Sequence, residues 1–319
     1  MSPYIKCLDA VVAELAGIAQ GENLASALID DRDYIDWVSG DSLEGSFEGI
    51  TDIRVKAGNG PQNIDASPID TEFEAYLENA IRPQILSGAI ADGSNPGDFD
   101  DRKIRWSGAG VTGSWWRDGN ILTLEVGPTA YPRYRQDCCR PKIEALQLML
   151  KGLQLYNDPF VYFARTMGVT VIPITAEGSV YIGERSANVD SPGLLNFVAG
   201  LATFNERIDK ISFYRDCQQE LQEEVGIFME IKPSNTRLIG IAGNPFTSET
   251  DLVFVVPTQA NESHFTDKNW SEHVRLVRIA NKTEAEELLY RGILPGETEP
   301  KMLSYGSRLG LAYLVKNHF

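Results

Sequence analysis

The chain has 319 residues, of which 43% are hydrophobic, and it carries a formal net charge of −16 at pH 7. This length exceeds that of one small domain, so we expect two structural units, or one domain with a large N-terminal elaboration. The acidic charge argues against nucleic acid as a partner, because phosphate backbones are bound by basic surface. A phosphorylated substrate would need a metal ion or local arginines.

Cysteine and histidine usage excludes several kinds of site. None of the cysteines has CxxC spacing, and the chain has only 3 histidines, so we expect no structural zinc site. The N-terminal apolar run contains Asp9 and Glu14, which indicates an amphipathic helix and not a signal peptide. No run reaches the length of a membrane span. We therefore expect a reduced cytoplasmic protein without a membrane partner, and the oligomeric state stays open.

The first 120 residues show few clear patterns. We predict helices at residues 8–20 and 71–80 and a loop at residues 93–101. Basic and apolar residues alternate over 102–106, and Asp118-Gly119 indicates a turn. These features favour an antiparallel hairpin with buried tryptophans, and a base-stacking platform is the alternative.

The next segment leads to a predicted domain boundary. A strand is expected over 121–126, followed by a turn rich in aromatic residues. Pro141 opens a predicted helix, since proline is tolerated in a first turn. A short helix over 159–166 should follow. We divide the chain into an N-terminal α+β region, residues 1–167, and a second domain, residues 168–319.

From residue 168 onward, strands and helices alternate. The patterns predict strands at 169–175, 180–184, 195–198, 237–242, 252–257 and 274–279, and helices at 211–225, 284–291 and 303–315. Thr283 and Glu286 have the spacing of a capping box. This order suits an α/β fold with a mixed sheet covered by helices on both faces.

The predicted helix at 211–225 carries the most informative residues. Glu220, Glu223 and Glu224 fall on one narrow face, because positions three and four apart are neighbours on a helix, and Asp216 joins them one turn earlier. Like charges so close repel, and a divalent cation such as Mg²⁺ would offset that repulsion. The alternative is a solvated acidic helix face.

This stretch resembles the Nudix box, G-x5-E-x7-R-E-U-x-E-E-x-G-U, where U is a bulky aliphatic residue. The matching residues are Gly200 and Glu206 in the first half and Glu220, Leu221, Glu223, Glu224, Gly226 and Ile227 in the second. Two departures are visible: 5 extra residues follow Glu206, and Gln219 replaces the arginine of the family. The resemblance implies a Nudix-type α/β/α sandwich and a Nudix pyrophosphohydrolase that depends on Mg²⁺, with Mn²⁺ as a substitute.

The resemblance also implies roles for residues. Glu220, Glu223 and Glu224 would hold the metal, and Glu220 and Glu223 are the catalytic candidates. The general base stays open between one of these glutamates and a downstream acid, Glu249 or Asp251.

Further residues are candidates for binding and for support of the loop. Arg185 is a candidate for a bidentate phosphate contact, with a surface salt bridge as the alternative. Tyr131 and Tyr134 could stack a base, and core packing is their alternative. Arg215, one turn before Gln219, is predicted to pair with Glu206 in place of the missing arginine and to steady the loop that carries Gly200.

Shorter stretches narrow the resemblance. The segments 127–134, 158–159, 168–171 and 238–244 are similar to the divergent Nudix UDP-glucose pyrophosphatases of animals. That similarity implies hydrolysis of a UDP-sugar, UDP-glucose or UDP-galactose, to UMP and a sugar 1-phosphate. The alternatives are a pyrophosphatase for ADP-ribose or dinucleotides, a catalytically degenerate Nudix fold kept as a ligand-sensing or protein-binding module, and a diphosphate isomerase.

Overall fold

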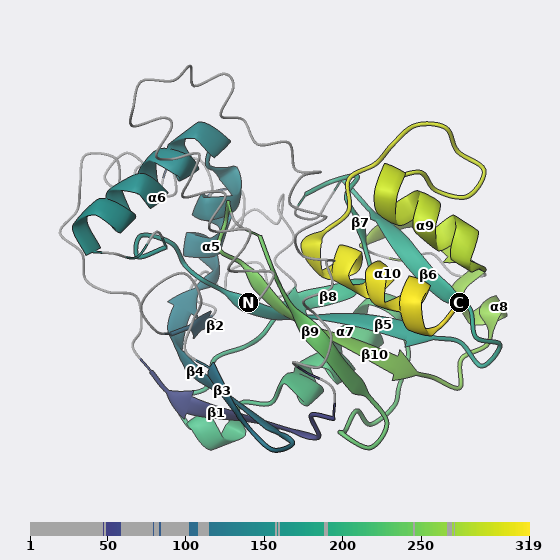
Figure 1. Cartoon of the computed structure of the whole chain (residues 1–319), viewed down its shortest axis with the longest axis horizontal. Coiled ribbons are helices and arrows are strands. Elements are labelled where there is room, and N and C mark those ends of the chain that lie inside the picture. The colour runs from purple at the N-terminus through teal and green to yellow at the C-terminus, as the bar shows by residue number, and fades with distance from the viewer. Residues whose placement is uncertain are drawn as a thin grey trace.

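A computed structural model gives the conformation of most of the chain after residue 46 (Figure 1). It describes residues 47, 49–58, 79, 83, 102–107, 115–156, 158, 160–187, 191–244, 246–266, 270 and 272–319. Apart from Asn79, the predicted helices at 8–20 and 71–80 and the loop at 93–101 lie outside the described residues. Within the described residues, no helix is long and apolar enough to cross a membrane.

The first sheet is built around one long strand, β4 (Ile121–Ala130). β1 (Asp52–Ala57) pairs with it in parallel, whereas β2 (Arg102–Trp106) and β3 (Trp115–Asp118) pair with it antiparallel. The predicted antiparallel hairpin is confirmed for β3 and β4, and of the tryptophans Trp106 is 4% exposed whereas Trp116 is 41% exposed. The predicted turn at Asp118-Gly119 joins β3 to β4.

Two helices follow β4. The predicted aromatic turn is wrong: β4 continues to Ala130, and α5 (Tyr131–Cys139) begins at once, with Pro132 in its first turn. α6 (Lys142–Tyr156) follows Pro141, as predicted. The predicted helix at 159–166 is also wrong, because residues 160–163 form turns and Arg165 takes a positive φ of 52°.

The second sheet is mixed, which confirms the α/β fold class. Its strand order is β11-β6-β5-β10-β9; β7 also pairs with β6, and β8 with β5. β10 runs parallel to β5, and the other pairs are antiparallel. The strands are β5 (Met167–Ile174), β6 (Val180–Arg185), β7 (Leu195–Asn196), β8 (Val198–Leu201), β9 (Arg237–Gly243), β10 (Thr250–Pro257) and β11 (His273–Ile279).

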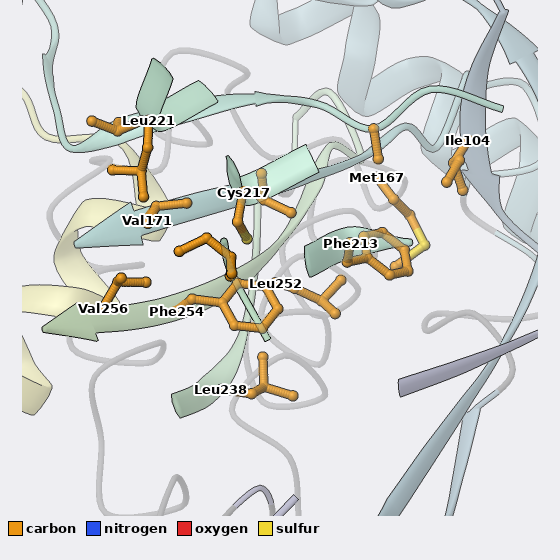
Figure 2. Close-up of a cluster of buried hydrophobic side chains, with 14 of the residues drawn as sticks. Ile104, Met167, Val171, Phe213, Cys217, Leu221, Leu238, Leu252, Phe254 and Val256 are labelled. Carbon is orange, nitrogen blue, oxygen red and sulfur yellow. The ribbon is translucent and has the colours of Figure 1, made fainter. Parts of the chain in front are cut away.

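Helices cover both faces of this sheet, and the alternation of side chains along the strands explains how. Val171 and Phe254 pack with α7 (Phe213–Val225), as Figure 2 shows for Cys217 and Leu221 on that helix. The next residues along the strands, such as Ile172 and Val253, point to the opposite face. There they pack in a second cluster with α9 (Lys282–Arg291) and α10 (Tyr305–Asn317).

Helix α9 begins earlier than predicted. Its N-cap is Asn281, whose side chain accepts a hydrogen bond from the backbone N–H of Glu284 at 3.1 Å. Glu284 in turn accepts from the backbone N–H of Ala280 at 2.7 Å. The capping box predicted for Thr283 and Glu286 is therefore wrong by two residues, because Asn281 caps the helix and Glu284 completes the capping box. A short helix that the patterns did not indicate, α8 (Glu262–Thr266), precedes β11.

Strand β2 connects the two sheets. On one side it pairs with β4, and on the other its Ile104 N–H donates to the carbonyl of Ala202 at 2.9 Å. The Trp106 N–H donates to the carbonyl of Arg165, also at 2.9 Å. Ile104 and Met167 belong to one hydrophobic core and lie side by side in Figure 2. The proposed boundary at residue 167 falls at the start of β5, where the two sheets share this core.

Candidate active site

The acidic helix forms as its sequence indicates. Ser212 is the N-cap of α7, and its side chain accepts a hydrogen bond from the backbone N–H of Arg215. Gly226 ends the helix in the left-handed conformation, with φ 61°, and its N–H donates to the carbonyl of Gln222 at 3.1 Å. The predicted helix at 211–225 is confirmed, so the register of the glutamates on it is settled.

Glu220 lies directly against the backbone of Gly200 in β8. A Cβ atom placed on Gly200 would come within 2.1 Å of the Glu220 Oε1 atom. Carbon and oxygen atoms cannot approach so closely without displacement. A residue without a side chain is therefore required at position 200, which gives a physical reason for the glycine of the box.

Glu224 is buried and held by two partners. Its Oε1 atom accepts a hydrogen bond from the backbone N–H of Ala199 at 3.0 Å, and its Oε2 atom lies 2.8 Å from His273 Nε2. The pKa of His273 is lowered to about 4, mainly by burial, so this histidine is neutral at pH 7. Within the described residues its Nδ1 atom has no hydrogen-bond partner, which fits the tautomer in which Nε2 carries the proton and donates a hydrogen bond to Glu224.

Glu223 is exposed, and its Oε1 atom accepts a hydrogen bond from Gln219 Nε2 at 3.0 Å. Gln219 stands where the box has arginine. A neutral amide there binds Glu223 without neutralising it. The helix thus keeps its full negative charge at this position.

Burial raises the pKa values of the inner carboxyl groups. Desolvation, with the charge of Glu224 next, raises the pKa of Glu220 well above its usual value. Desolvation, followed by the charge of Glu272, raises the pKa of Glu224 to about 8. Burial is also the main reason that the pKa of Asp216 is raised to about 7, and its Oδ2 atom has no hydrogen-bond partner in the part of the chain that the structure describes. Nearby cations offset part of this effect: Arg215 and Lys103 lower the pKa of Asp216, and Lys103 lowers that of Glu220.

The donor set suits a hard divalent cation. Magnesium prefers carboxylate oxygens, and the raised pKa values of Glu220 and Glu224 show the electrostatic cost that a cation would remove. In the described part of the chain, however, no group of three or more His, Cys, Asp or Glu side chains is already arranged to hold a metal ion. The reason is local: Glu224 is held by Ala199 and His273, and Glu223 by Gln219, so these carboxylates would have to turn toward a cation.

A cavity of about 1120 Å³ opens over α7 and β8. It brings together residues predicted from distant parts of the sequence; its lining includes Tyr131, Tyr134, Arg185, Gly200, Glu220 and Glu223. Glu224 lies behind the cavity wall, where its carboxylate accepts a hydrogen bond from the backbone N–H of Ala199, a residue that lines the cavity. The volume slightly exceeds the usual range of small-molecule sites, about 300–1,000 Å³.

The two tyrosines form part of the wall between α5 and the second sheet. Tyr131 is 4% exposed and Tyr134 is 8% exposed, and their ring centroids are 6.0 Å apart. The Tyr134 hydroxyl donates to Glu249 Oε1 at 3.1 Å. The structure therefore favours the packing alternative, in which the rings shape the cavity.

The two downstream acids differ in setting. Asp251 lies in β10 and not in the preceding loop, and its Oδ2 atom accepts a hydrogen bond from Thr170 Oγ1 at 2.8 Å. Burial raises the pKa of Asp251 to about 6. Glu249 accepts a hydrogen bond from the Tyr134 hydroxyl group. Both residues line the cavity.

The predicted pair of Glu206 with Arg215 is replaced by another. Glu206 forms an ion pair with Arg102 on β2, whereas Arg215 is exposed on the outer side of α7. Strand β2 reaches Glu206 because the backbone N–H of Phe204 donates to the carbonyl of Arg102 at 3.0 Å. Arg102 and Glu206 side chains are 57% and 74% exposed, so their pair should stabilise the fold by no more than about 1 kcal/mol.

Sequence reasoning missed three site residues, Lys103, Glu272 and His273. Lys103 belongs to the basic pattern at 102–106, but no local signal places that strand beside residues 202–204. Glu272 directly precedes β11 and His273 begins it, 45 and 46 residues after Ile227 at the end of the box. The available signal was the polar pair Glu272-His273 at the beginning of an apolar strand. The spacing in the sequence could not show that His273 contacts Glu224.

We expect the metal-free protein to lose stability as the pH rises from 6.5 to 8. The folded-state pKa values of Glu224, about 8, and Asp216, about 7, exceed their unfolded values, so their protonated forms stabilise the fold at low pH. That stability is lost as the pH rises through the folded pKa. His273, with its lowered pKa, acts in the opposite direction only below about pH 6.5. The free energy of unfolding in EDTA, measured with urea, should fall by on the order of 1–2 kcal/mol.

The control for this measurement is Glu224→Gln, which removes a carboxyl group whose pKa is raised to about 8. Its stability should change less between pH 6.5 and 8 than that of the wild type. A wild-type stability that is constant or rises over this range would contradict the electrostatic account.

Comparisons with known proteins identify distant similarities of fold. No family model matches the chain, and no curated protein sequence matches it. The solved MutT protein from Methanosarcina mazei Go1 matches at 17% identity and TM-score 0.33, over 48% of this chain and 95% of that one. A NUDIX hydrolase from Alicyclobacillus acidocaldarius matches at 13% and 0.36, over 47% and 91%.

A third solved structure is the NUDIX domain of Shewanella oneidensis NrtR complexed with ADP ribose. It matches at 16% identity and TM-score 0.25, over 35% of this chain and 71% of that chain. These are similarities of fold at low identity, and no statement about activity follows from them.

Proposed function

We propose that the chain is a metal-dependent Nudix-type hydrolase that cleaves the pyrophosphate bond of a nucleoside diphosphate linked to another group. The observation that carries the proposal is the contact of Glu220 with Gly200 on the wall of a cavity of about 1120 Å³. This contact joins the two halves of the box, although 5 extra residues separate them in the sequence.

The chemistry assigned to each residue follows from its setting. A bound Mg²⁺ ion would neutralise the diphosphate oxygens and lower the pKa of the attacking water. Glu220, Glu223 and Glu224 would hold it. We assign proton transfer to Glu223, because its carboxylate is exposed at the cavity and can exchange the proton with solvent. Arg185, which lines the same cavity at the end of β6, would contact a phosphate.

For the substrate we propose a UDP-sugar, which would yield UMP and a sugar 1-phosphate. This choice is supported by the sequence similarity at 127–134 and 238–244. The cavity is large enough for a nucleotide-sized ligand, and the aromatic wall of Tyr131 and Tyr134 borders it.

The test is hydrolysis with magnesium over a panel of UDP-glucose, UDP-galactose, ADP-ribose, a dinucleotide and coenzyme A. UDP-sugars should give the highest kcat/KM, with UMP as a product identified by chromatography. Excess EDTA should abolish turnover, and magnesium should raise the melting temperature, because it binds the folded state.

Each failure has a separate meaning. A higher kcat/KM on ADP-ribose or on the dinucleotide would remove the UDP-sugar assignment and leave the hydrolase. Full activity in EDTA would exclude the metal site. Binding without turnover across the panel would favour a degenerate ligand-binding module.

A further inference from the structure

Strand β2 brings a buried lysine to the acidic cavity. The side chain of Lys103 is on the wall of the cavity, and the residue is 8% exposed. Its backbone is fixed there, because Lys103 forms a β-bridge with Thr203, three residues after Gly200. Hydrogen bonds from Ile104 N–H to Ala202 and from Phe204 N–H to Arg102 secure both sides of this bridge. The lysine therefore belongs to the first sheet and lies beside the box.

The charge of Lys103 acts on the acidic helix. It lowers the pKa of both Asp216 and Glu220, against the larger effect of burial. All three residues line the cavity. A lysine held at 8% exposure loses hydration, so its ammonium needs anionic oxygens around it.

Two of the other cations of the cavity wall already have carboxylate partners. Arg140 Nη1 lies 2.7 Å from Asp137 Oδ1, and Lys301 pairs with Glu184. Arg185 pairs with His273 of β11, and its charge acts on Glu224. Lys103 shares the cavity wall with Glu220 and its charge acts on that carboxylate, so the fold places this cation beside one of the proposed metal ligands.

We propose that Lys103 binds a phosphate oxygen of the bound diphosphate, so that the first sheet completes the site formed by α7 and β8. This inference rests on the proposed function. It assigns to residues before the box a direct part in substrate binding. The competing account is that Lys103 serves only as a counter-ion for Asp216 and Glu220.

The first test measures binding of methylenediphosphonate, a diphosphate that cannot be hydrolysed, by calorimetry in the presence of magnesium. Lys103→Met should weaken binding about tenfold to a hundredfold, the range for loss of a charge-assisted hydrogen bond. Lys103→Arg should keep most of the affinity, because the positive charge remains. The matched control is Lys56→Met, an exposed lysine on β1 of the same sheet, which should bind as the wild type does.

A double variant separates phosphate binding from charge compensation. If Lys103 only balances Asp216, Lys103→Met combined with Asp216→Asn should restore binding and thermal stability together. We expect stability to recover and binding to stay weak. Restored binding in the double variant, unchanged binding in Lys103→Met, or no binding to the wild type would each overturn the inference.

The hydrolysis panel keeps this result distinct from the proposed function. A wild type that binds methylenediphosphonate through Lys103 but hydrolyses no substrate would refute the hydrolase and support the lysine site. With an active wild type, Lys103→Met should raise KM about tenfold or more on the best substrate, and Lys56→Met should not.

Discussion

Gly200→Ala should remove most of the turnover and lower the stability of the fold. The added Cβ would lie 2.1 Å from Glu220 Oε1, so the carboxylate or strand β8 must move. Overpacking of this kind costs about 1–3 kcal/mol, and displacement of a metal-binding carboxylate should lower kcat roughly a hundredfold. Urea unfolding and steady-state kinetics with magnesium measure the two effects.

Two further variants identify the cause of the Gly200→Ala effect. Gly119→Ala adds a methyl group at φ 57° with no atom of the described residues within 4 Å of it, so it should cost stability without affecting turnover. Adding Glu220→Asp to Gly200→Ala shortens the acid and should recover part of the stability but not the activity. If Gly200→Ala retained wild-type kinetics, the contact between the two halves of the box would have no role in the chemistry.

Glu223→Gln and Glu224→Gln should each lower kcat by roughly a hundredfold or more while the fold stays intact. Both changes keep the shape of the side chain and remove a negative charge from a repelling group. Glu224→Gln should also raise the stability of the metal-free protein at pH 8, because a buried carboxylate is replaced by a neutral amide that can still accept from Ala199. Kinetics with magnesium and urea unfolding in EDTA are the measurements.

Glu230→Gln is the matched control for these two variants. Glu230 follows α7, is exposed and pairs with Lys232, so its loss should change neither kinetics nor stability by a measurable amount. Near wild-type turnover in both Glu223→Gln and Glu224→Gln would mean that the acidic face of α7 is only solvated surface.

The sequence was informative where the relevant signal is local. The start and end of α7 depend on Ser212 and Gly226, and the side-chain spacing along the helix sets the positions of its glutamates. The strands of the second sheet follow from runs of apolar residues, because such runs need burial on both faces. These features can be read within windows of about fifteen residues.

The parts that could not be predicted depend on contacts between distant segments. Nothing near Glu206 indicates Arg102 as its partner, because 104 positions separate them. The same strand pairing places Lys103 in the cavity. Helix α5 was missed for a different reason: glycine and proline before Tyr131 suggested a turn, whereas β4 accommodates them beside β2.

Strand β2 pairs with β4 on one side and with residues around Ala202 on the other, and this affects which fragments of the chain can fold by themselves. A fragment that began at residue 168 would leave the carbonyl of Ala202 without its donor and would uncover the core surface that Ile104 occupies. An unpaired strand edge beside exposed apolar side chains is a template for association with other chains. We therefore expect a fragment that keeps both β2 and β4 to aggregate less than one that begins at residue 168.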